Sequence, residues 1–238
     1  MQRYFIDQDL IVNQEVLMNP EDSHHIKNVM RLAVNDLVIV NTFAGLCFEA
    51  KIVAFEKKQA KLEFVKALVN DYQPLNLDLG LTLIKKDNFE LALQKITELG
   101  VRKIIPLQTE RSIIKIDDYA KKKTRYELIC KEASEQSERT VMPIISNYTD
   151  LEQLDSNAYD YRFFAYERED EVSLKTQIQT IKKSEKVLVI IGPEGGFSEK
   201  EINKLKSSGF ISISLGKTIL RAETAAIYVA SVFRHHWG

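Results

Sequence analysis

The spacing of apolar residues changes near residue 72, and this change restricts the folds open to the chain more than any other feature. Before it, runs such as DLVIVNT and QAKLEFVKAL are rich in β-branched and aromatic residues and partly alternate, which is typical of antiparallel strands. After it, strand-like runs alternate with helical stripes, which predicts a mostly parallel sheet covered by helices on both faces. Pro74 lies in the stretch NDYQPLN and predicts a linker there. We therefore predict two domains, residues 1–72 and residues 73–238, the second of the α/β class.

Two helices of the second part show their starting points in the sequence. Asp87 and Glu90 have capping-box spacing, and the apolar stripe that follows ends at Gly100, so we predict a helix that begins near Asp87. Ser198 and Glu201 form an S-x-x-E pattern, which predicts the start of another helix. In the first part, PEDSHHIKNVMR predicts one short helix among the strands of a small recognition barrel.

Composition fits a protein with a packed apolar core. Hydrophobic residues make up 45% of the chain and charged residues 28%, as in ordinary globular proteins. The sequence contains neither the roughly 20-residue apolar run of a membrane span nor the apolar region of a secretory signal. Cys47 and Cys130 are far apart, and the histidine pairs at 24–25 and 235–236 lie in polar helical stretches. We therefore expect a reduced, cytoplasmic protein with surface histidines and no metal site.

Charge is unevenly distributed along the chain. The formal net charge is −1, which argues against a uniformly basic coat for nucleic acid. Residues 85–139 nevertheless carry 13 Lys and Arg against 10 Asp and Glu, an excess of three, whereas residues 1–71 carry 8 against 10. Such an excess is expected either of a solvated face or of a local surface for RNA.

Two glycine patterns resemble nucleotide-binding motifs but have the wrong spacing. LGKT resembles the end of a phosphate-binding P-loop, yet position 211, five places before Gly216, is Ile211 rather than glycine. Gly192, Gly195 and Gly196 do not have the G-x-G-x-x-G spacing and do not follow the first strand. Hydrolysis of a nucleoside triphosphate is therefore disfavoured.

The stretch VLVIIGPEGGF passes from an apolar strand into a glycine-rich loop that contains Glu194. The glycines alone are compatible with a simple tight turn. A second loop, GKTILRAET, follows the predicted strand ISISL, and both loops lie at the carboxyl ends of strands, where open α/β sheets bind ligands. A carboxylate in a dry site disfavours a polyphosphate, so Glu194 favours a neutral or cationic ligand such as S-adenosylmethionine.

Several motifs together resemble one family. IIGPEGGFSEKEI followed by LGKTILRAETAAI closely resembles the RsmE family of SPOUT methyltransferases, which methylate N3 of a uridine in 16S ribosomal RNA. HHIKNVMRLAVND, KITELGVRKIIPL, ERS and EASEQSERTVMP are also similar to that family's motifs and occur in the same order, so the resemblance covers the whole chain. The chain departs from the pattern at Ala222, where threonine is expected, and at Asn35, where glycine is more common.

The resemblance implies a PUA-like RNA-binding barrel followed by a methyltransferase domain whose C-terminal part forms a trefoil knot. The periodicity of the sequence does not indicate the knot, and true knots are rare. S-adenosylmethionine would lie in the knot, held mainly by backbone groups, in a homodimer with the site near the subunit interface. The residues implied for cofactor binding are Glu167, Ile191, Gly192, Pro193, Glu194, Gly195, Gly196, Leu215, Gly216, Ile219, Leu220 and Thr224. The last helix, AETAAIYVASVFRHH, is apolar nearly all round, which fits cover by a partner subunit or burial within one subunit.

Two charged residues are candidates for catalysis. Arg221 precedes the last helix and is suited to stabilise the anion that forms when uracil N3 loses its proton. Glu223 is a candidate to orient Arg221 or to accept that proton, although an acid near a helix N-terminus is also favourable without any catalytic role.

Phosphate contacts are expected from basic residues, which position RNA without reading its sequence. The candidates are Arg31, Lys85, Lys86, Arg111 and Arg139. The predicted function is methylation of uridine N3 in 16S ribosomal RNA of the small subunit. Alternatives are a methyltransferase of the same fold that acts on another RNA base or a ribose, and a non-catalytic RNA-binding protein of ribosome assembly.

Overall fold

The computed structural model describes residues 1–8, 11–112 and 119–238. It divides the chain into two compact units, the first with one apolar core and the second with two. The first unit consists of Met1–Gln73 and Ser134–Met142, and the second of Pro74–Ala133 and Pro143–Gly238. The chain therefore returns to the first unit once, a step that the sequence did not indicate.

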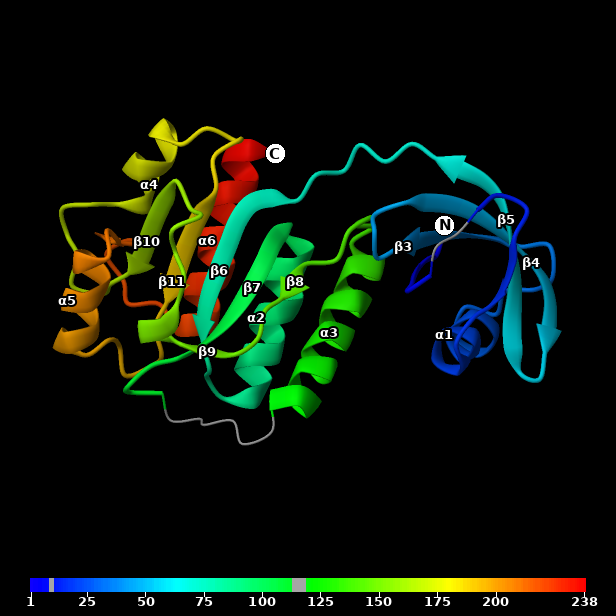
Figure 1. The fold of residues 1–238 in the computed structure, drawn as a ribbon, viewed down its shortest axis with the longest axis horizontal. Helices are drawn as coiled ribbons and strands as arrows, with labels where there is room; N and C mark the ends of the chain where they lie inside the picture. Colours follow the sequence, from blue (N-terminus) through cyan, green and yellow to red (C-terminus); the bar gives the residue numbers. More distant parts are fainter. Residues whose placement is uncertain (9–10, 113–118) are drawn as a thin grey trace. The chain divides into compact units, whose positions relative to one another are not determined.

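The first unit is built on a five-stranded sheet with the order β1-β3-β4-β5-β2 (Figure 1). The pair β1 and β3 is parallel, and the other pairs are antiparallel. Its elements are β1 (Arg3–Ile6), β2 (Glu15–Leu17), α1 (Pro20–His24), the π-helical turn η1 (His25–Val29), β3 (Leu37–Thr42), β4 (Cys47–Glu56) and β5 (Gln59–Leu68). The strands predicted from DLVIVNT and QAKLEFVKAL are confirmed as β3 and β5, whereas β1 and β2 are too short to show a pattern.

The start of α1 follows from its local sequence. Asn19 is the N-cap and accepts a hydrogen bond from the backbone N of Asp22 at 2.8 Å, and Pro20 occupies the first turn. The one predicted helix is in fact α1 followed directly by η1. His24 is exposed, and His25 is half-buried with its Nδ1 3.0 Å from the hydroxyl of Tyr4.

The second unit contains a seven-stranded sheet in which every pairing is parallel, so the predicted α/β class is confirmed. The strand order is β12-β10-β11-β6-β7-β8, with β9 also beside β7. Its strands are β6 (Leu75–Thr82), β7 (Val101–Gln108), β8 (Ile144–Ile145), β9 (Thr149–Asp150), β10 (Tyr161–Ala165), β11 (Val187–Ile191) and β12 (Ile211–Ile213). Its helical elements are α2 (Lys86–Glu98), most of α3 (Tyr119–Gln136), η2 (Leu151–Gln153), α4 (Leu174–Gln177), η3 (Ile178–Thr180), α5 (Glu199–Ser207) and α6 (Ala222–Trp237).

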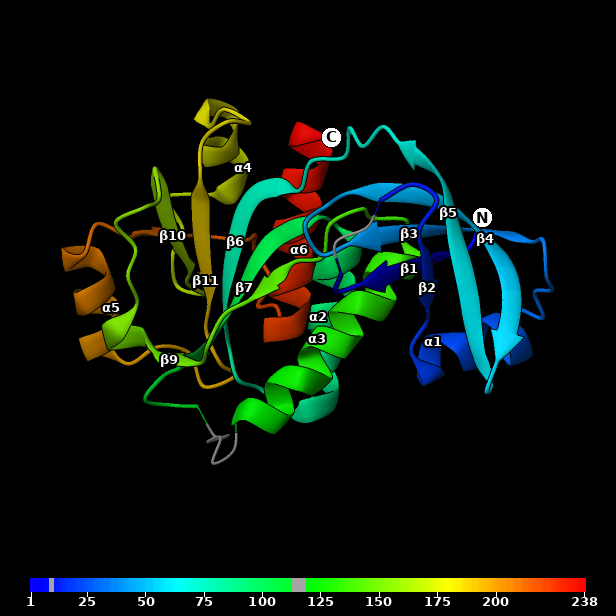
Figure 2. The same ribbon diagram turned by 45° about the vertical axis from the view of Figure 1, so that its right-hand side comes forward.

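Alternate residues of β11 enter separate apolar cores on the two faces of this sheet. Val187, Val189 and Ile191 belong to the core that includes residues of α2, α3 and α6. Leu188 and Ile190 belong to the core that includes α5. Because a strand buried on both faces needs apolar residues at every position, VLVII reads as a continuous apolar run. Figure 2 shows α2 and α6 packed side by side behind the sheet.

Helix α2 begins one residue earlier than predicted and without the predicted capping box. Its N-cap is Lys85, which makes no capping hydrogen bond through its side chain, and Asp87 lies inside the first turn. The capping box of Asp87 and Glu90 was therefore a wrong prediction. The buried stripe was predicted correctly, and Gly100 follows the helix with φ of +96°, a conformation that glycine adopts easily.

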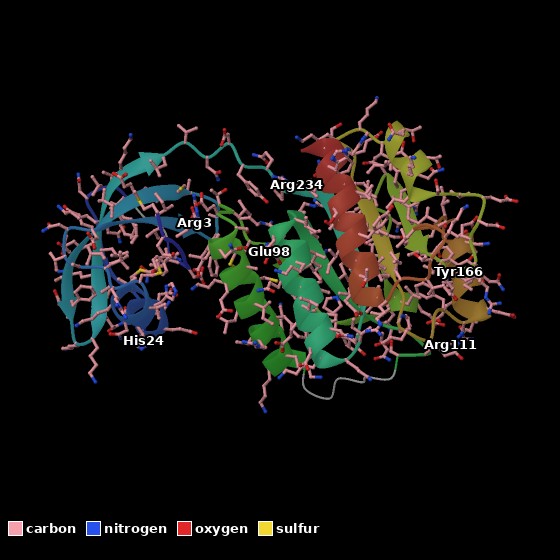
Figure 3. All side chains as sticks on the ribbon, turned by 180° about the vertical axis from the view of Figure 1, so that it is seen from behind. Arg3, His24, Glu98, Arg111, Tyr166 and Arg234 are labelled. Atoms are coloured by element: carbon pink, nitrogen blue, oxygen red, sulfur yellow. The ribbon has the colours of Figure 1, made fainter. Side chains whose placement is uncertain are left out.

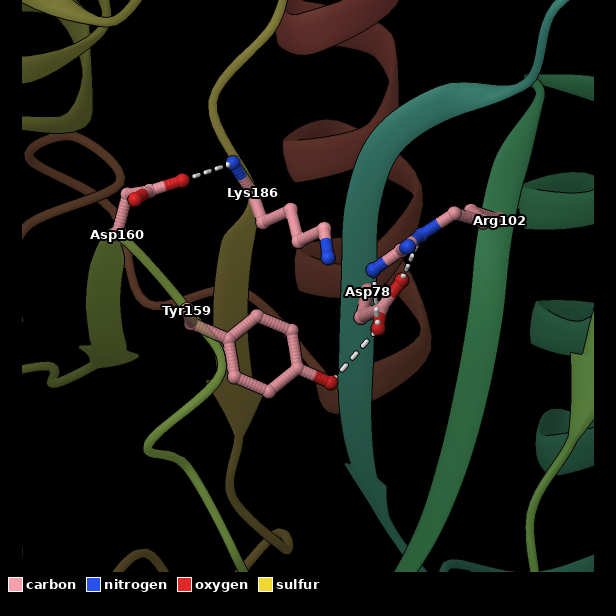
Figure 4. Close-up of polar contacts among 5 residues, drawn as sticks. All are labelled: Asp78, Arg102, Tyr159, Asp160 and Lys186. Carbon is pink, nitrogen blue, oxygen red and sulfur yellow. Dashed lines mark hydrogen bonds and ion pairs between the residues drawn. The ribbon is translucent and has the colours of Figure 1, made fainter.

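A buried ion pair joins strands near the amino ends of the sheet (Figure 4). Asp78 of β6 is fully buried and accepts two hydrogen bonds of 2.9 Å from the guanidinium of Arg102 in β7. The hydroxyl of Tyr159 donates a third to Asp78 at 2.7 Å. A buried carboxylate is tolerated when it is paired and hydrogen-bonded in this way. The cluster therefore belongs to the scaffold, at the edge opposite the glycine-rich loops.

The apolar character of α6 is largely explained by burial within one chain. Ala226, Val229 and Phe233 are fully buried, and Ile227 and Val232 pack partly against the same core. Of the two explanations for this helix, burial in a single subunit accounts for most of its apolar residues. Among the described residues, no helix has the length and apolarity to cross a membrane.

Candidate functional site

A cavity of about 360 Å³ lies at the carboxyl ends of β10, β11 and β12. Its walls are three loops that follow these strands, which is where open α/β sheets place their ligand sites. The predicted cofactor residues that line it are Glu167, Ile191, Gly192, Pro193, Glu194, Gly195, Gly196, Leu215, Gly216, Ile219 and Leu220. Of that predicted set, Thr224 is exposed on α6 and is not part of the lining.

Two glycines of the loop after β11 disfavour a side chain, Gly192 through lack of space and Gly196 through its backbone conformation. A Cβ atom at Gly192 would lie 2.9 Å from the buried ring of Phe197, closer than real contacts allow. Gly196 has φ of +66°, and a Cβ atom there would lie 3.1 Å from the Glu167 carboxylate. The backbone N of Gly196 donates to the Pro193 carbonyl at 2.9 Å and closes a turn. At Gly192 and Gly196 this loop therefore presents its backbone to the cavity, while Glu194 and Phe197 of the same loop also line it.

The loop after β12 forms the opposite wall. Gly216 has φ of +130° and open space around the position of a Cβ atom. Ile219 is 80% exposed although it lines the cavity. The sequence prediction omitted further lining residues that flank the predicted ones, and only their neighbourhood in the sequence could have indicated them: Ala165, Tyr166, Phe197, Ser214, Lys217, Thr218, Ala222 and Ala225.

Glu194 does not have the dry environment that the sequence suggested. It lines the cavity but is exposed, so water screens its carboxylate. Its power to reject a phosphate is therefore weaker than we expected. Lys217 and Arg221 also line the cavity together with Glu167, so the charge of the walls is balanced.

The two catalytic candidates have different surroundings. Arg221 is the N-cap of α6, is exposed and lines the cavity. Glu223 is 8% exposed and does not line the cavity. Its Oε2 atom is buried and has no hydrogen-bond partner among the described residues. A buried carboxylate oxygen without a partner is costly, which marks it as a group that a further contact would satisfy.

A buried carboxylate links the loop after β7 to the start of α5. Glu201 accepts hydrogen bonds from the backbone N of Ser198 and of Glu110, each at 2.8 Å. The capping box predicted for Ser198 and Glu201 is therefore confirmed. Arg111, next to Glu110, donates from Nη1 to the Gly195 carbonyl at 3.0 Å. Figure 3 labels Arg111 and Tyr166 in this part of the second unit.

The structure places the candidate RNA residues in unlike environments. Lys85 and Lys86 are exposed at the start of α2, and Arg31 is exposed in the first unit with φ of +55°. Arg139 is only 1% exposed, donates from Nε to the Val141 carbonyl at 3.0 Å, and lies 5.6 Å from the ring of Tyr72. Arg139 is therefore a wrong prediction for a phosphate contact, because protein groups enclose its guanidinium.

Two family models match the chain. The model for an RNA methyltransferase domain matches residues 71–234, and the model for an RNA methyltransferase PUA domain matches residues 19–65. The fold and the cavity thus define an RNA methyltransferase with an N-terminal PUA-like domain. Ribosomal RNA small subunit methyltransferase E of Bacillus subtilis is 34% identical over 99% of this chain and 96% of its own length. The relative of the same name from Rickettsia conorii is 34% identical over 94% of this chain and 91% of its own length. The chain belongs to this family, RsmE, which confirms the resemblance found in the motifs.

Solved structures share the fold over the full length. A putative methyltransferase from Legionella pneumophila, solved with bound S-adenosylmethionine, is 31% identical and superposes with a TM-score of 0.89, covering 98% of this chain and 96% of that one. The ribosomal RNA small subunit methyltransferase E of Neisseria gonorrhoeae, bound to S-adenosylmethionine, is 28% identical with a TM-score of 0.87, covering 100% of this chain and 98% of that one.

Proposed function

We propose that the protein transfers a methyl group from S-adenosylmethionine to N3 of a uridine in 16S ribosomal RNA. The observation that carries the proposal is the cavity whose three loops contain the family's motifs at the carboxyl edge of the sheet. Relatives named for methylation of small-subunit ribosomal RNA, and similar structures that hold S-adenosylmethionine, support it. The proposal includes that the protein methylates ribosomal RNA in the cytoplasm.

The residues of the cavity fit this cofactor. A volume of about 360 Å³ lies in the range of small-molecule sites. The segment from Ile191 to Gly196 lines the cavity, and its backbone carbonyl groups, with those amide groups that have no partner among the described residues, suit the hydroxyl and amino groups of adenosine. The lining carboxylate of Glu167, beside Gly196, suits a cationic group. When bound, S-adenosylmethionine supplies a methyl group on a positively charged sulfur, which a nitrogen anion attacks directly.

Arg221 is proposed to stabilise the uracil anion. Loss of the N3 proton leaves a negative charge spread over O2, N3 and O4, and a guanidinium carries a permanent positive charge with several N–H donors. Arg221 reaches the cavity from the N-cap of α6, where the helix dipole adds to its positive field. It is therefore proposed to act on the base rather than on the cofactor.

Glu223 is proposed to act on the proton or on Arg221. It lies two residues after Arg221 in the first turn of α6, and its Oε2 accepts no hydrogen bond from the part of the chain that the structure describes. In one role it accepts the N3 proton, directly or through water, and in the other it orients the Arg221 guanidinium. Replacement by glutamine separates the two, because glutamine keeps an acceptor oxygen but cannot take up a proton.

A homodimer is proposed as the active form, with the site beside the interface. Ile219 lines the cavity and is 80% exposed, and Tyr228 of α6 and Leu91 of α2 are 39% and 43% exposed. A second subunit would cover these apolar side chains, which lie on or near two helices that pack together. The trefoil knot implied by the family resemblance stays a prediction.

The proposal is tested on ribosomal RNA itself. Mass spectrometry of 16S ribosomal RNA from a strain that lacks the gene should reveal a uridine without its N3 methyl group, and the purified protein should restore it. Methylation of another base or of a ribose would identify the same-fold alternative. Calorimetric titration with S-adenosylmethionine addresses the non-catalytic alternative, which predicts no binding.

A further inference from the structure

Lys217 is a cation of the cofactor cavity to which the proposed chemistry gives no task. It lies in the loop after β12, is exposed and lines the cavity. Within the part of the chain that the structure describes, its ammonium has neither an ion-pair partner nor a hydrogen-bond partner. An accessible ammonium that lines a ligand cavity in this way is available to an anionic group of the ligand.

The backbone that carries Lys217 is held in place. The hydroxyl of Ser214 accepts a hydrogen bond from the backbone N of Gly216 and donates one to the Gly216 carbonyl, each at 3.3 Å. Ser214 is itself anchored, because its backbone N donates to the Val172 carbonyl at 2.8 Å and its carbonyl accepts from the backbone N of Leu174 at 3.0 Å. The start of the Lys217 side chain is therefore fixed at the cavity wall, while its ammonium can adjust to a ligand.

Charges of opposite sign occupy different walls of the cavity. Glu167 follows β10 and Glu194 follows β11, whereas Lys217 and Arg221 both follow β12. All four side chains are exposed, so a ligand in the cavity can reach them. Arg221 is assigned to the uracil anion, which leaves Lys217 as the other cation among the described lining residues.

The charges of S-adenosylmethionine match this division. Its sulfonium and its α-ammonium are cationic and suit the walls that carry Glu167 and Glu194. Its α-carboxylate would be repelled by those acids and needs a cation on the remaining wall. An RNA phosphate is the other anion that could approach Lys217. The carboxylate is favoured because Lys217 lines the same cavity as the glycine-rich loop.

We propose that the Lys217 ammonium forms an ion pair with the α-carboxylate of S-adenosylmethionine. The inference rests on the proposed function, because it requires this cofactor in the cavity. It makes Lys217 a determinant of cofactor affinity, and it predicts that the protein prefers ligands that carry the carboxylate. Methyl transfer itself takes place at the sulfur, so Lys217 has no part in the chemical step.

The test compares S-adenosylmethionine with its decarboxylated form, which lacks the carboxylate but keeps the sulfonium and the amino group. Each is titrated into the full-length protein by calorimetry. In Lys217→Ala we expect the Kd for S-adenosylmethionine to rise about three- to fivefold, the upper part of the range for an exposed ion pair. The Kd for the decarboxylated form should stay within about twofold of the wild-type value.

Two further variants of Lys217 test the role of its charge. Lys217→Glu should raise the Kd for S-adenosylmethionine about 10- to 25-fold, because repulsion replaces attraction. Lys217→Arg keeps the positive charge and should keep the wild-type Kd. The matched control is Lys182→Ala, which removes an exposed lysine that does not line the cavity and should change neither Kd. Unchanged binding of the decarboxylated form also shows that each variant is folded.

Three results would overturn the ion pair. The first is an unchanged Kd for S-adenosylmethionine in Lys217→Ala. The second is an equal rise for both ligands, which would mean that Lys217 acts without the carboxylate. The third is a higher KM for ribosomal RNA with a shallower salt dependence while both Kd values stay unchanged, which would assign Lys217 to an RNA phosphate.

The same measurements separate this inference from the proposed function. If Lys217→Ala discriminates between the two ligands as expected but the wild type methylates no uridine N3, the ion pair stands and the proposed function is wrong. If the wild type methylates uridine N3 while Lys217→Ala binds both ligands as the wild type does, the ion pair is wrong and the function stands. A wild-type protein that binds neither ligand would overturn both.

Discussion

The cofactor cavity and a second cavity of about 320 Å³ between the start of α2 and the first turns of α3, called here the α2–α3 pocket, lie at the same edge of one sheet. They are nevertheless built from different parts of the chain. The cavity is formed by three loops, in which Gly192 has no room for a side chain and Gly196 has a positive φ that disfavours one. The pocket is formed by side chains of a connecting segment and two helices, with cations around an apolar floor. A site made of backbone depends on a local motif, whereas a site made of side chains depends on how helices pack. The two should therefore respond to different substitutions.

The largest expected effect is on chemistry in the cavity. Arg221→Ala should lower kcat about 10²- to 10³-fold, as expected when one donor to a developing anion is lost. The Kd for S-adenosylmethionine, measured by calorimetry, should stay within twofold, because the guanidinium is assigned to the base. Lys86→Ala in the α2–α3 pocket is the comparison: it should raise the KM for RNA more than it lowers kcat. An unchanged kcat in Arg221→Ala would remove Arg221 from catalysis.

The next largest effect tests whether cofactor binding in the cavity depends on the backbone of the glycine-rich loop. Gly192→Ala places a Cβ atom 2.9 Å from the Phe197 ring, and the resulting shift of the loop should cost about 1–3 kcal/mol. We expect the Kd for S-adenosylmethionine to rise about 10- to 100-fold. Gly195→Ala is the matched control, since a Cβ atom there meets Arg111 at an ordinary 3.4 Å. Similar affinities in both variants would contradict a backbone-built site.

A smaller effect is expected where Glu201 joins two loops. Glu201→Ala removes the acceptor of two backbone N–H groups, at Ser198 and Glu110, and should destabilise the protein by about 1–2 kcal/mol. Thermal unfolding should then occur roughly 2–8 °C lower. Glu199→Ala, an exposed neighbour in the same helix, should leave the melting temperature unchanged. A wild-type melting temperature in Glu201→Ala would show that these contacts add nothing to stability.

The smallest effect concerns one cation of the α2–α3 pocket. Lys86→Ala should raise the KM for RNA only about two- to threefold, because Lys86 is 78% exposed and each phosphate contact is screened by salt. Lys175→Ala, an exposed lysine of α4, serves as the control. If Lys86→Ala lowered kcat as much as Arg221→Ala does, the two sites would not act separately, and the contrast drawn between them would be wrong.

Sequence reasoning succeeded where residues close in the chain decide the structure. The capping box of Ser198 and Glu201 requires only four consecutive residues, and it is present. The same spacing at Asp87 and Glu90 failed, because α2 begins at Lys86 and Asp87 lies within its first turn. A capping pattern indicates a helix start only when the first residue has extended backbone, and packing decides this.

Sequence reasoning failed where distant segments meet. Arg139 has the charge of a phosphate contact, but Ser134–Met142 returns to the first unit and buries it beside Tyr72. Lys86 and Arg125 are far apart in the sequence, and Glu90 brings them together across α2 and α3. No local pattern reports such contacts, because they depend on how the two helices dock.

The sequence by itself determined the alternation of strands and helices in the second unit, the glycine loops of the cavity, and the family to which their motifs belong. These features follow from periodicity and from residues with special backbone freedom, both of which are local properties. Only the tertiary structure decided that Arg139 is buried, that Glu194 is exposed, and that a carboxylate oxygen of Glu223 has no hydrogen-bond partner among the described residues. Burial and hydrogen-bond pairing depend on neighbours from the whole fold. The α2–α3 pocket likewise exists only because the fold places α2 and α3 side by side.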